Sequence, residues 1–232
     1  MKKFFVTGGT GYMGARLIAR LIKKGHHVTA LVRKGSEHKV TPGAEIIIAN
    51  PFDAGTFQSA ISPGSVFIQL LGVAHPSPRK ASQFEEIDLR SVKASADAAS
   101  RAGISHFIYV SVAMSPVKLM QAYQAVRKEG EAYCLTKKMN CTFIRPWYVV
   151  GPGHWWPLLL LPIYGLAEII PSWKRKMRSM ALVTIRQMLN CLLLAAESEP
   201  EPLRIVEING IRNSDAKKIA NARTLSQKPS YL

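Results

Sequence analysis

The feature that most constrains this chain is a glycine-rich run, TGGTGYMG, which directly follows the β-rich stretch KFFV and contains Gly8, Gly9, Gly11 and Gly14. Glycines in this setting let the backbone turn sharply out of a strand, approach a pyrophosphate closely and begin a helix whose N–H groups point at the anion. A bound dinucleotide is therefore the leading hypothesis. A tight turn without a ligand is the alternative reading.

The residues around the glycines favour the dinucleotide. Residues 3–6 form an apolar strand pattern, and residues 11–24 place apolar side chains at helical spacing. Gly25 then ends the helix, and a second β-branched run follows at residues 27–32. Strand, glycine turn, helix and strand together predict one βαβ unit.

The end of that second strand indicates which dinucleotide binds. An acidic residue about 20 positions after the glycines bonds the ribose 2′-hydroxyl of NAD, but this chain has Arg33 and Lys34 there. Cations at this point can pair with a 2′-phosphate, so NADP(H) is favoured over NAD(H). The alternative is that both are solvated surface cations.

Composition narrows the class of protein. With 232 residues, the chain is long enough for one well-filled core. Its 3 widely spaced cysteines and its lack of a secretory signal predict a reduced, cytoplasmic setting, and no metal site is expected. The net charge of +16 admits an anionic partner, although the charges form no single block and no specific nucleic-acid motif is present.

Short apolar runs recur along the chain and predict the fold. The runs at residues 45–49, 65–71, 106–111 and 141–145 are almost continuously apolar, which is typical of interior strands covered on both faces. A final strand could follow at 203–208, and helical patterns lie near 57–61 and at 84–102, 123–138 and 183–196. This alternation predicts an α/β fold of the Rossmann type, a doubly wound parallel sheet with helices on both faces and a small C-terminal substrate or lid portion. Ligands then bind at the carboxyl ends of the strands. We expect a dinucleotide-binding core at 1–150, a lid or substrate portion at 151–211 packed on the same domain, and a basic tail at 212–232.

The segment after Pro146 is rich in Trp, Leu and Pro. Pro157, Pro162 and Pro171 interrupt it too often for a membrane-spanning helix. Three readings stay open, of which a lid over the substrate pocket comes first because of its place after the sixth strand. The others are a surface for a protein partner or homodimer, and a peripheral contact with an anionic membrane.

The motifs resemble those of the short-chain dehydrogenase/reductase family, in its atypical and extended NAD(P)H-binding, NmrA-like and epimerase-like branch. TGGTGYMG is similar to the family's cofactor signature, IQLLG to the segment along the adenosine, and RPWYVVGPG to the segment beside the nicotinamide. The resemblance covers roughly residues 2–207. It implies cofactor contacts from Gly8, Thr10, Gly11, Tyr12, Met13, Arg33, Leu71, Ser111 and Pro146, whereas Asn50 stands where the family usually has an acidic residue.

The resemblance also implies a catalytic Ser/Thr, Tyr and Lys. YQAVRKEGE is similar to the family's YxxxKxxxE helix, with Tyr123 as the proton-exchanging phenol and Arg127 in the lysine position, on the same helix face. Val112 falls where the catalytic hydroxyl would sit, one residue after Ser111. Lys128 is rotated about 100° from Arg127 around the helix and is a weaker candidate. Tyr123 and Arg127 could also be a half-exposed aromatic and a surface cation.

Two functions follow from these residues. The first is an NADP(H)-dependent oxidoreductase acting on a small apolar carbonyl or alcohol, with Tyr123 and Arg127 in a degenerate catalytic site. The second is a cofactor-binding sensor or assembly partner that has lost the chemistry, as Val112 and Arg127 suggest. His75, in the loop after the fourth strand, is the one histidine with a chemical role in view.

Overall fold

The computed structural model describes residues 1–115, 120–160 and 180–214. In these ranges the chain forms a seven-stranded parallel sheet in the order β3-β2-β1-β4-β5-β6-β9. The strands are β1 (Lys3–Thr7), β2 (His27–Val32), β3 (Glu45–Ile48), β4 (Val66–Gln69), β5 (His106–Val110), β6 (Cys141–Ile144) and β9 (Leu203–Val206). The predicted doubly wound α/β fold is confirmed.

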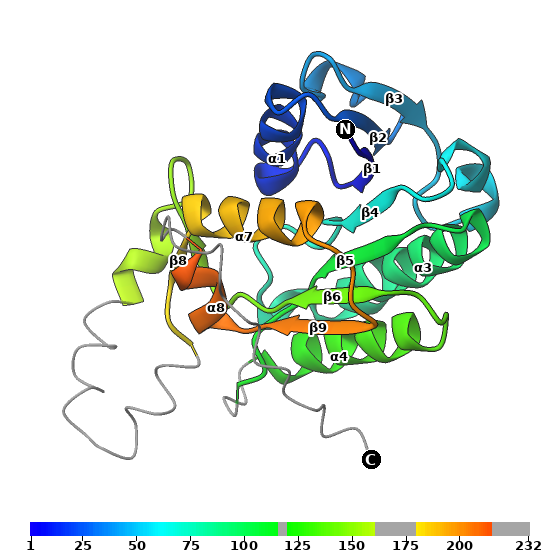
Figure 1. Ribbon diagram of the computed structural model, residues 1–232. Coiled ribbons are helices and arrows are strands. Elements are labelled where there is room, and N and C mark those ends of the chain that lie inside the picture. The colour runs from blue at the N-terminus through cyan, green and yellow to red at the C-terminus, as the bar shows by residue number, and fades with distance from the viewer. Residues whose placement is uncertain (116–119, 161–179, 215–232) are drawn as a thin grey trace.

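Helices cover both faces of this sheet (Figure 1). The α-helices are α1 (Tyr12–Lys23), α2 (Ala81–Gln83), α3 (Arg90–Ala102), α4 (Gln121–Leu135), α7 (Ile185–Glu197) and α8 (Ile208–Asn213). One apolar core lies between the sheet and α1, α7 and α8, and a second lies under α3. In the second core, the stacked rings of Phe5, Phe67 and Phe107 join β1, β4 and β5, with neighbouring ring centroids 5.2 Å apart. These aromatic contacts bind adjacent strands together.

The strand order reverses between β1 and β4, so their carboxyl ends form the crevice where ligands bind in such sheets. The buried side chains of Thr7 and Gln69 hydrogen-bond across this point. Gln69 also accepts a hydrogen bond from Ser95 at 2.9 Å and donates one to Ser91 at 3.1 Å. This buried polar network fixes the end of β1, from which the glycine turn leaves, against β4 and α3.

The helix expected at 84–102 is confirmed, and its first part, η5 (Phe84–Leu89), is a π-helix that leads into α3. Two other local predictions were wrong. Residues 57–61 were expected to be helical, but the chain there forms 3₁₀ turns, η2 (Ala54–Thr56) and η3 (Gln58–Ala60), beside a fully buried Phe57. β3 was expected to be an interior strand, but it is an edge strand that leaves Ile46 and Ile48 exposed. The isoleucines of β3 therefore indicate a preference for strand structure and do not indicate that the strand is buried.

The chain after β6 contributes to both the sheet and the crevice. β7 (Val149–Val150) and β8 (Val183–Thr184) pair as a small parallel sheet, and a capping box of Thr184 and Gln187 begins α7. β9 then joins the main sheet beside β6. The short helical turns are η1 (Glu37–Lys39), η4 (Pro78–Lys80) and η7 (Trp156–Leu160).

Some predictions concern parts of the chain outside the described residues. These are the later part of the Trp- and Leu-rich segment, at 161–179, and most of the basic tail, at 215–232. Within the described ranges, no helix combines the length and apolar character needed to cross a bilayer.

Candidate functional site

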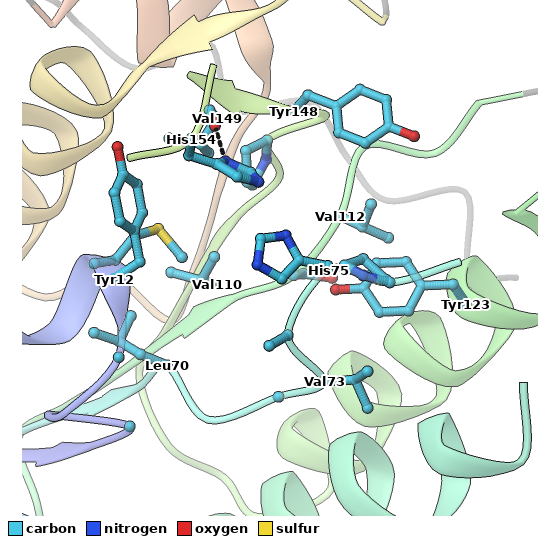
Figure 2. Close-up of a pocket in the computed structure, with 18 of the residues that line it drawn as sticks. Tyr12, Leu70, Val73, His75, Val110, Val112, Tyr123, Tyr148, Val149 and His154 are labelled. Carbon is cyan, nitrogen blue, oxygen red and sulfur yellow. Dashed lines mark hydrogen bonds between the residues drawn. The ribbon is translucent and has the colours of Figure 1, made fainter. Parts of the chain in front are cut away.

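A pocket with a volume of about 330 Å³ opens at the carboxyl ends of the strands (Figure 2). The glycine turn and the start of α1 form one side, and the loop after β4, the end of β5, α4 and the segment after β6 form the rest. Its wall includes Gly8, Gly11, Tyr12, Met13, Gly14, Leu70, Gly72, Val73, His75, Val110, Ser111, Val112, Met120, Tyr123, Arg127, Pro146, Trp147, Tyr148, Val149 and His154. The pocket thus joins the two groups of residues that the sequence singled out.

The glycine turn depends on the absence of side chains at two positions. Gly8 has a φ of +69°, and a Cβ atom there would lie 2.8 Å from the backbone of Leu70 and Leu71. A Cβ atom on Gly14 would fall against the carbonyl oxygen of Gly8. Glycine at these positions therefore lets α1 and β4 approach the turn closely.

The start of α1 offers unsatisfied donors to an anion. Its N-cap is Gly11, no side chain caps the helix, and the first turn has no acidic residue. The N–H groups of such a helix end, together with its dipole, favour a phosphate. The arrangement fits the pyrophosphate of a dinucleotide.

Buried polar atoms on the pocket wall give an independent test of that fit. The Tyr12 hydroxyl, the Ser111 hydroxyl and Nε of Arg127 are buried and have no hydrogen-bond partner among the described residues. Buried polar groups are almost always satisfied in folded proteins, so these three atoms call for a ligand. The residues that carry them lie on α1, directly after β5 and on α4, and all three residues line the pocket.

Arg127, on α4, is buried, with 7% of its side chain exposed. It forms an ion pair with Asp88 from η5, and it donates hydrogen bonds to the Tyr109 hydroxyl at 3.2 Å and the Val110 carbonyl at 3.0 Å. The alternative reading of Arg127 as a surface cation does not match this position, whereas Lys128 is exposed. The Arg127 guanidinium stays protonated, and its three partners fix its position in the pocket wall.

Asp88 was not singled out in the sequence, yet it connects three parts of the site. Its side chain is fully buried in η5, pairs with Arg127 and accepts a 3.1 Å hydrogen bond from the Val73 backbone N–H. A Cβ atom on Gly72 would lie 2.6 Å from the Asp88 carboxylate and against Arg127. The loop after β4 therefore passes directly over this ion pair, at a π-helix of the kind that often marks functional sites.

A second buried ion pair joins α4 to the sheet. Arg145, at the end of β6, pairs with the fully buried Glu131 of α4 and with Glu207 after β9. The Nε atom of Arg145 donates to Glu131 at 2.9 Å. The helix that carries Tyr123 is consequently fixed to both η5 and the sheet.

Tyr123 lies one helical turn before Arg127, whose guanidinium carbon is 5.0 Å from the centre of the phenol ring. Burial raises the pKa of Tyr123 above its ordinary value of 10.0, and the charge of Arg127 offsets this only in part. Because Asp88 neutralises much of the Arg127 charge, Tyr123 stays a neutral phenol near neutral pH. Its hydroxyl can therefore donate a proton.

The end of β5 supplies little further polarity to the pocket. Ser111 and Val112 both line it, with the Ser111 amide bonded to the Ile144 carbonyl at 2.8 Å. Val112 presents no hydroxyl, so this part of the pocket wall is apolar.

Two histidines face the pocket, and the sequence indicated only one of them. His75 is a non-glycine residue with a φ of 51°, and its ring centroid lies 5.0 Å from that of His154 (Figure 2). His154 donates from Nδ1 to the Val149 carbonyl at 2.7 Å and accepts at Nε2 from the Trp156 indole N–H at 2.8 Å. These two bonds fix the orientation of the His154 ring at the pocket wall. No motif marked it, because the β7 turn that aims it was not foreseen.

The expected cofactor residues divide into two groups. Gly8, Gly11, Tyr12, Met13, Ser111 and Pro146 line the pocket together with Tyr123 and Arg127. Thr10, Arg33 and Leu71 are not among the lining residues, although the neighbouring Leu70 is. Arg33 is exposed just after β2, at the same edge of the sheet.

Comparison with known proteins agrees with this geometry. Residues 8–150, more than half of the chain, match the NAD(P)H-binding family. The chain belongs to this family. Its relatives are reductases and dehydrogenases of the extended short-chain type, which confirms the resemblance seen in the sequence and a dinucleotide as the ligand class.

Two curated relatives align with different lengths of the chain. A ceramide reductase of Caulobacter vibrioides is 25% identical over 210 residues, covering 89% of this chain and 64% of that protein. A 3β-hydroxysteroid dehydrogenase/Δ5→4-isomerase of Mycobacterium tuberculosis is 26% identical over 115 residues, covering 47% and 31%. The chain therefore spans less than two thirds of either relative.

Among solved structures, the Bordetella bronchiseptica enzyme WbmG in complex with NAD and UDP has a TM-score of 0.64 and 18% identity. The match covers 88% of this chain and 72% of that one. At this identity the likeness establishes the shared fold.

Proposed function

We propose that this protein is an NADP(H)-dependent oxidoreductase that reduces a small apolar carbonyl compound. The observation that carries the proposal is that one pocket brings together the glycine turn, three unsatisfied polar atoms and the Tyr123 phenol. A phenol on the wall of a cofactor pocket is the group that proton transfer to a bound carbonyl requires.

The residues divide the reaction between them. A reduced nicotinamide dinucleotide, when bound, supplies the hydride. Tyr123, a neutral phenol at neutral pH, donates the accompanying proton to the carbonyl oxygen, and the nearby Arg127 charge stabilises the phenolate that forms. Arg127 acts as a fixed donor towards the cofactor ribose through Nε, and it cannot itself relay a proton.

The choice of NADP(H) rests on Arg33 and Lys34, which directly follow β2 at the place where an NAD-binding protein has an acidic residue. A 2′-phosphate would gain charge-assisted hydrogen bonds from such cations. We expect Arg33→Ala to weaken NADPH binding about tenfold, roughly 1.4 kcal/mol, and to leave NADH binding unchanged. Fluorescence titration measures both, with Lys93→Ala, an exposed cation on α3, as the control.

The apolar substrate rests on Val110, Val112, Met120, Trp147 and Val149, which line the pocket. The two relatives are named for ceramide and a hydroxysteroid, both apolar compounds, which supports an apolar substrate. A panel of apolar ketones and aldehydes, assayed by NADPH oxidation, tests this class of substrate.

Tyr123→Phe tests the catalytic assignment. We expect turnover to fall by roughly a hundredfold or more while NADPH binding is retained, since general acid catalysis contributes about that much. Tyr133→Phe, on the same helix but bonded to Asp97, is the matched control and should keep full turnover. Full activity in Tyr123→Phe, or NADPH binding with no turnover of any carbonyl, would contradict the proposed reaction.

A further inference from the structure

The rim of the pocket bears a patch of exposed apolar side chains, which we call the lip. It consists of Trp155, Trp156, Leu158 and Leu159, with exposed fractions of 55%, 41%, 38% and 79%. In the described ranges the other large apolar side chains with comparable exposure are scattered, at Met1, Ile46, Ile48 and Leu194. Isolated exposed apolar residues are ordinary, whereas four within five positions indicate an interaction surface.

The lip is coupled directly to the pocket wall. Gly153 and His154 line the pocket immediately before the lip begins. The Trp156 indole donates to His154, and its ring lies 5.0 Å from that of Tyr148, another lining residue. Anything that covers the lip therefore lies at the mouth of the pocket.

Charge around the lip favours an anionic partner. The chain as a whole has a net charge of +16, from 31 Lys and Arg residues against 15 Asp and Glu residues. The first turns of α1, α7 and α8 hold no acidic residue. Arg16 of α1 is exposed and donates to the Pro152 carbonyl at 3.4 Å, which places a cation beside the lip.

We propose that the lip docks onto an anionic lipid surface, with the pocket mouth facing the membrane. Tryptophan and leucine side chains partition into the boundary between headgroups and acyl chains, and nearby cations are attracted to anionic lipids. The proposal does not depend on the proposed reaction. A second copy of this chain fits less well, because it would bring two strongly positive surfaces together.

Vesicle sedimentation tests the proposal. The full chain is mixed with phosphatidylcholine vesicles that contain or lack phosphatidylglycerol, at low and high salt. We expect binding to the anionic vesicles at low salt, weaker binding at high salt and weaker binding to neutral vesicles. The double variant Trp155→Ser/Leu159→Ser should bind roughly tenfold more weakly or worse, since it removes buried apolar area from the interface.

The controls separate docking from folding and from the proposed reaction. Ile48→Ser removes an apolar side chain of similar exposure, 54%, from the β3 edge and should bind vesicles like the wild type. Trp156 is left intact because it bonds to His154. The double variant should keep wild-type NADPH affinity, a readout that does not require turnover. Equal vesicle binding by the double variant and the wild type would overturn the proposal. So would a wild type that does not bind anionic vesicles, or a wild-type dimer that the double variant abolishes.

Discussion

The two sides of the pocket are built in different ways. On the cofactor side, Gly8 and Gly14 let strand, turn and helix approach one another, and the contacts are made by the backbone. On the catalytic side, Arg127 is held between Asp88 and the Tyr109 hydroxyl, and the contacts are made by buried charge. The cofactor side requires glycine, which has no side chain, at two positions. The catalytic side requires a buried cation and a buried carboxylate that form an ion pair. The two sides should therefore fail in different ways when they are changed.

The largest effect should come from breaking the catalytic side. Asp88→Ala leaves the buried Arg127 guanidinium without its carboxylate, which should cost about 3–5 kcal/mol of unfolding free energy. The double variant Asp88→Ala/Arg127→Met removes both charges and should recover most of that loss. Urea unfolding measures both. If Asp88→Ala changed stability by less than about 1 kcal/mol, the pair would not support this side of the pocket.

A change on the cofactor side should act on binding. Gly14→Val places a side chain against the Gly8 carbonyl and should weaken NADPH binding roughly a hundredfold, about 2.8 kcal/mol. Ala19→Ser, on the exposed side of α1, is the control and should bind NADPH normally. Wild-type affinity in Gly14→Val would show that close approach of α1 to the turn is not required.

A change at the opposite end of β5 should affect neither side. Burial lowers the pKa of His106 from 6.5 to about 4, and its Nε2 lies 2.8 Å from the Thr142 hydroxyl. Between those pH values the unfolded chain binds a proton that the folded chain does not, so stability falls as the pH decreases from 6.5 towards 4. The loss attributable to His106 between pH 7 and pH 4 should be about 3 kcal/mol.

His106→Gln tests this assignment, because glutamine keeps a hydrogen-bonding group but does not titrate. Unfolding free energies measured from pH 7 to 4 should decline less steeply in the variant, by the amount given above. NADPH affinity at pH 7 should be equal in the two proteins. A parallel decline in both would assign the pH dependence to other groups.

The smallest effect should come from restoring a hydroxyl on the catalytic side. Val112→Thr keeps the side-chain shape and adds a donor, which should raise kcat a few-fold, about 1 kcal/mol of barrier. Val112→Ala removes bulk without adding a donor and should give no increase. Steady-state assays on a turned-over carbonyl make the comparison, and an unchanged kcat in Val112→Thr would show that the substrate oxygen lies elsewhere.

The sequence predicted the sheet and the glycine turn because both depend on local pattern, namely short apolar runs and glycines at fixed spacing. It did not reveal Asp88, because a single acidic residue in a helical pattern ordinarily indicates a solvated position. Its partner Arg127 lies 39 residues away and is reached only through the fold. His154 was missed for the same reason, and the exposure of β3 depends on strand order, which apolar runs do not encode.

The packing at Gly72 has a consequence for how this family can vary. Because a methyl group there would collide with both Asp88 and Arg127, the three positions cannot change independently. Loss of the carboxylate alone would leave the charge at position 127 buried without its partner, and a side chain at position 72 would displace both members of the pair. In an alignment of relatives, positions 72, 88 and 127 should therefore covary as a set.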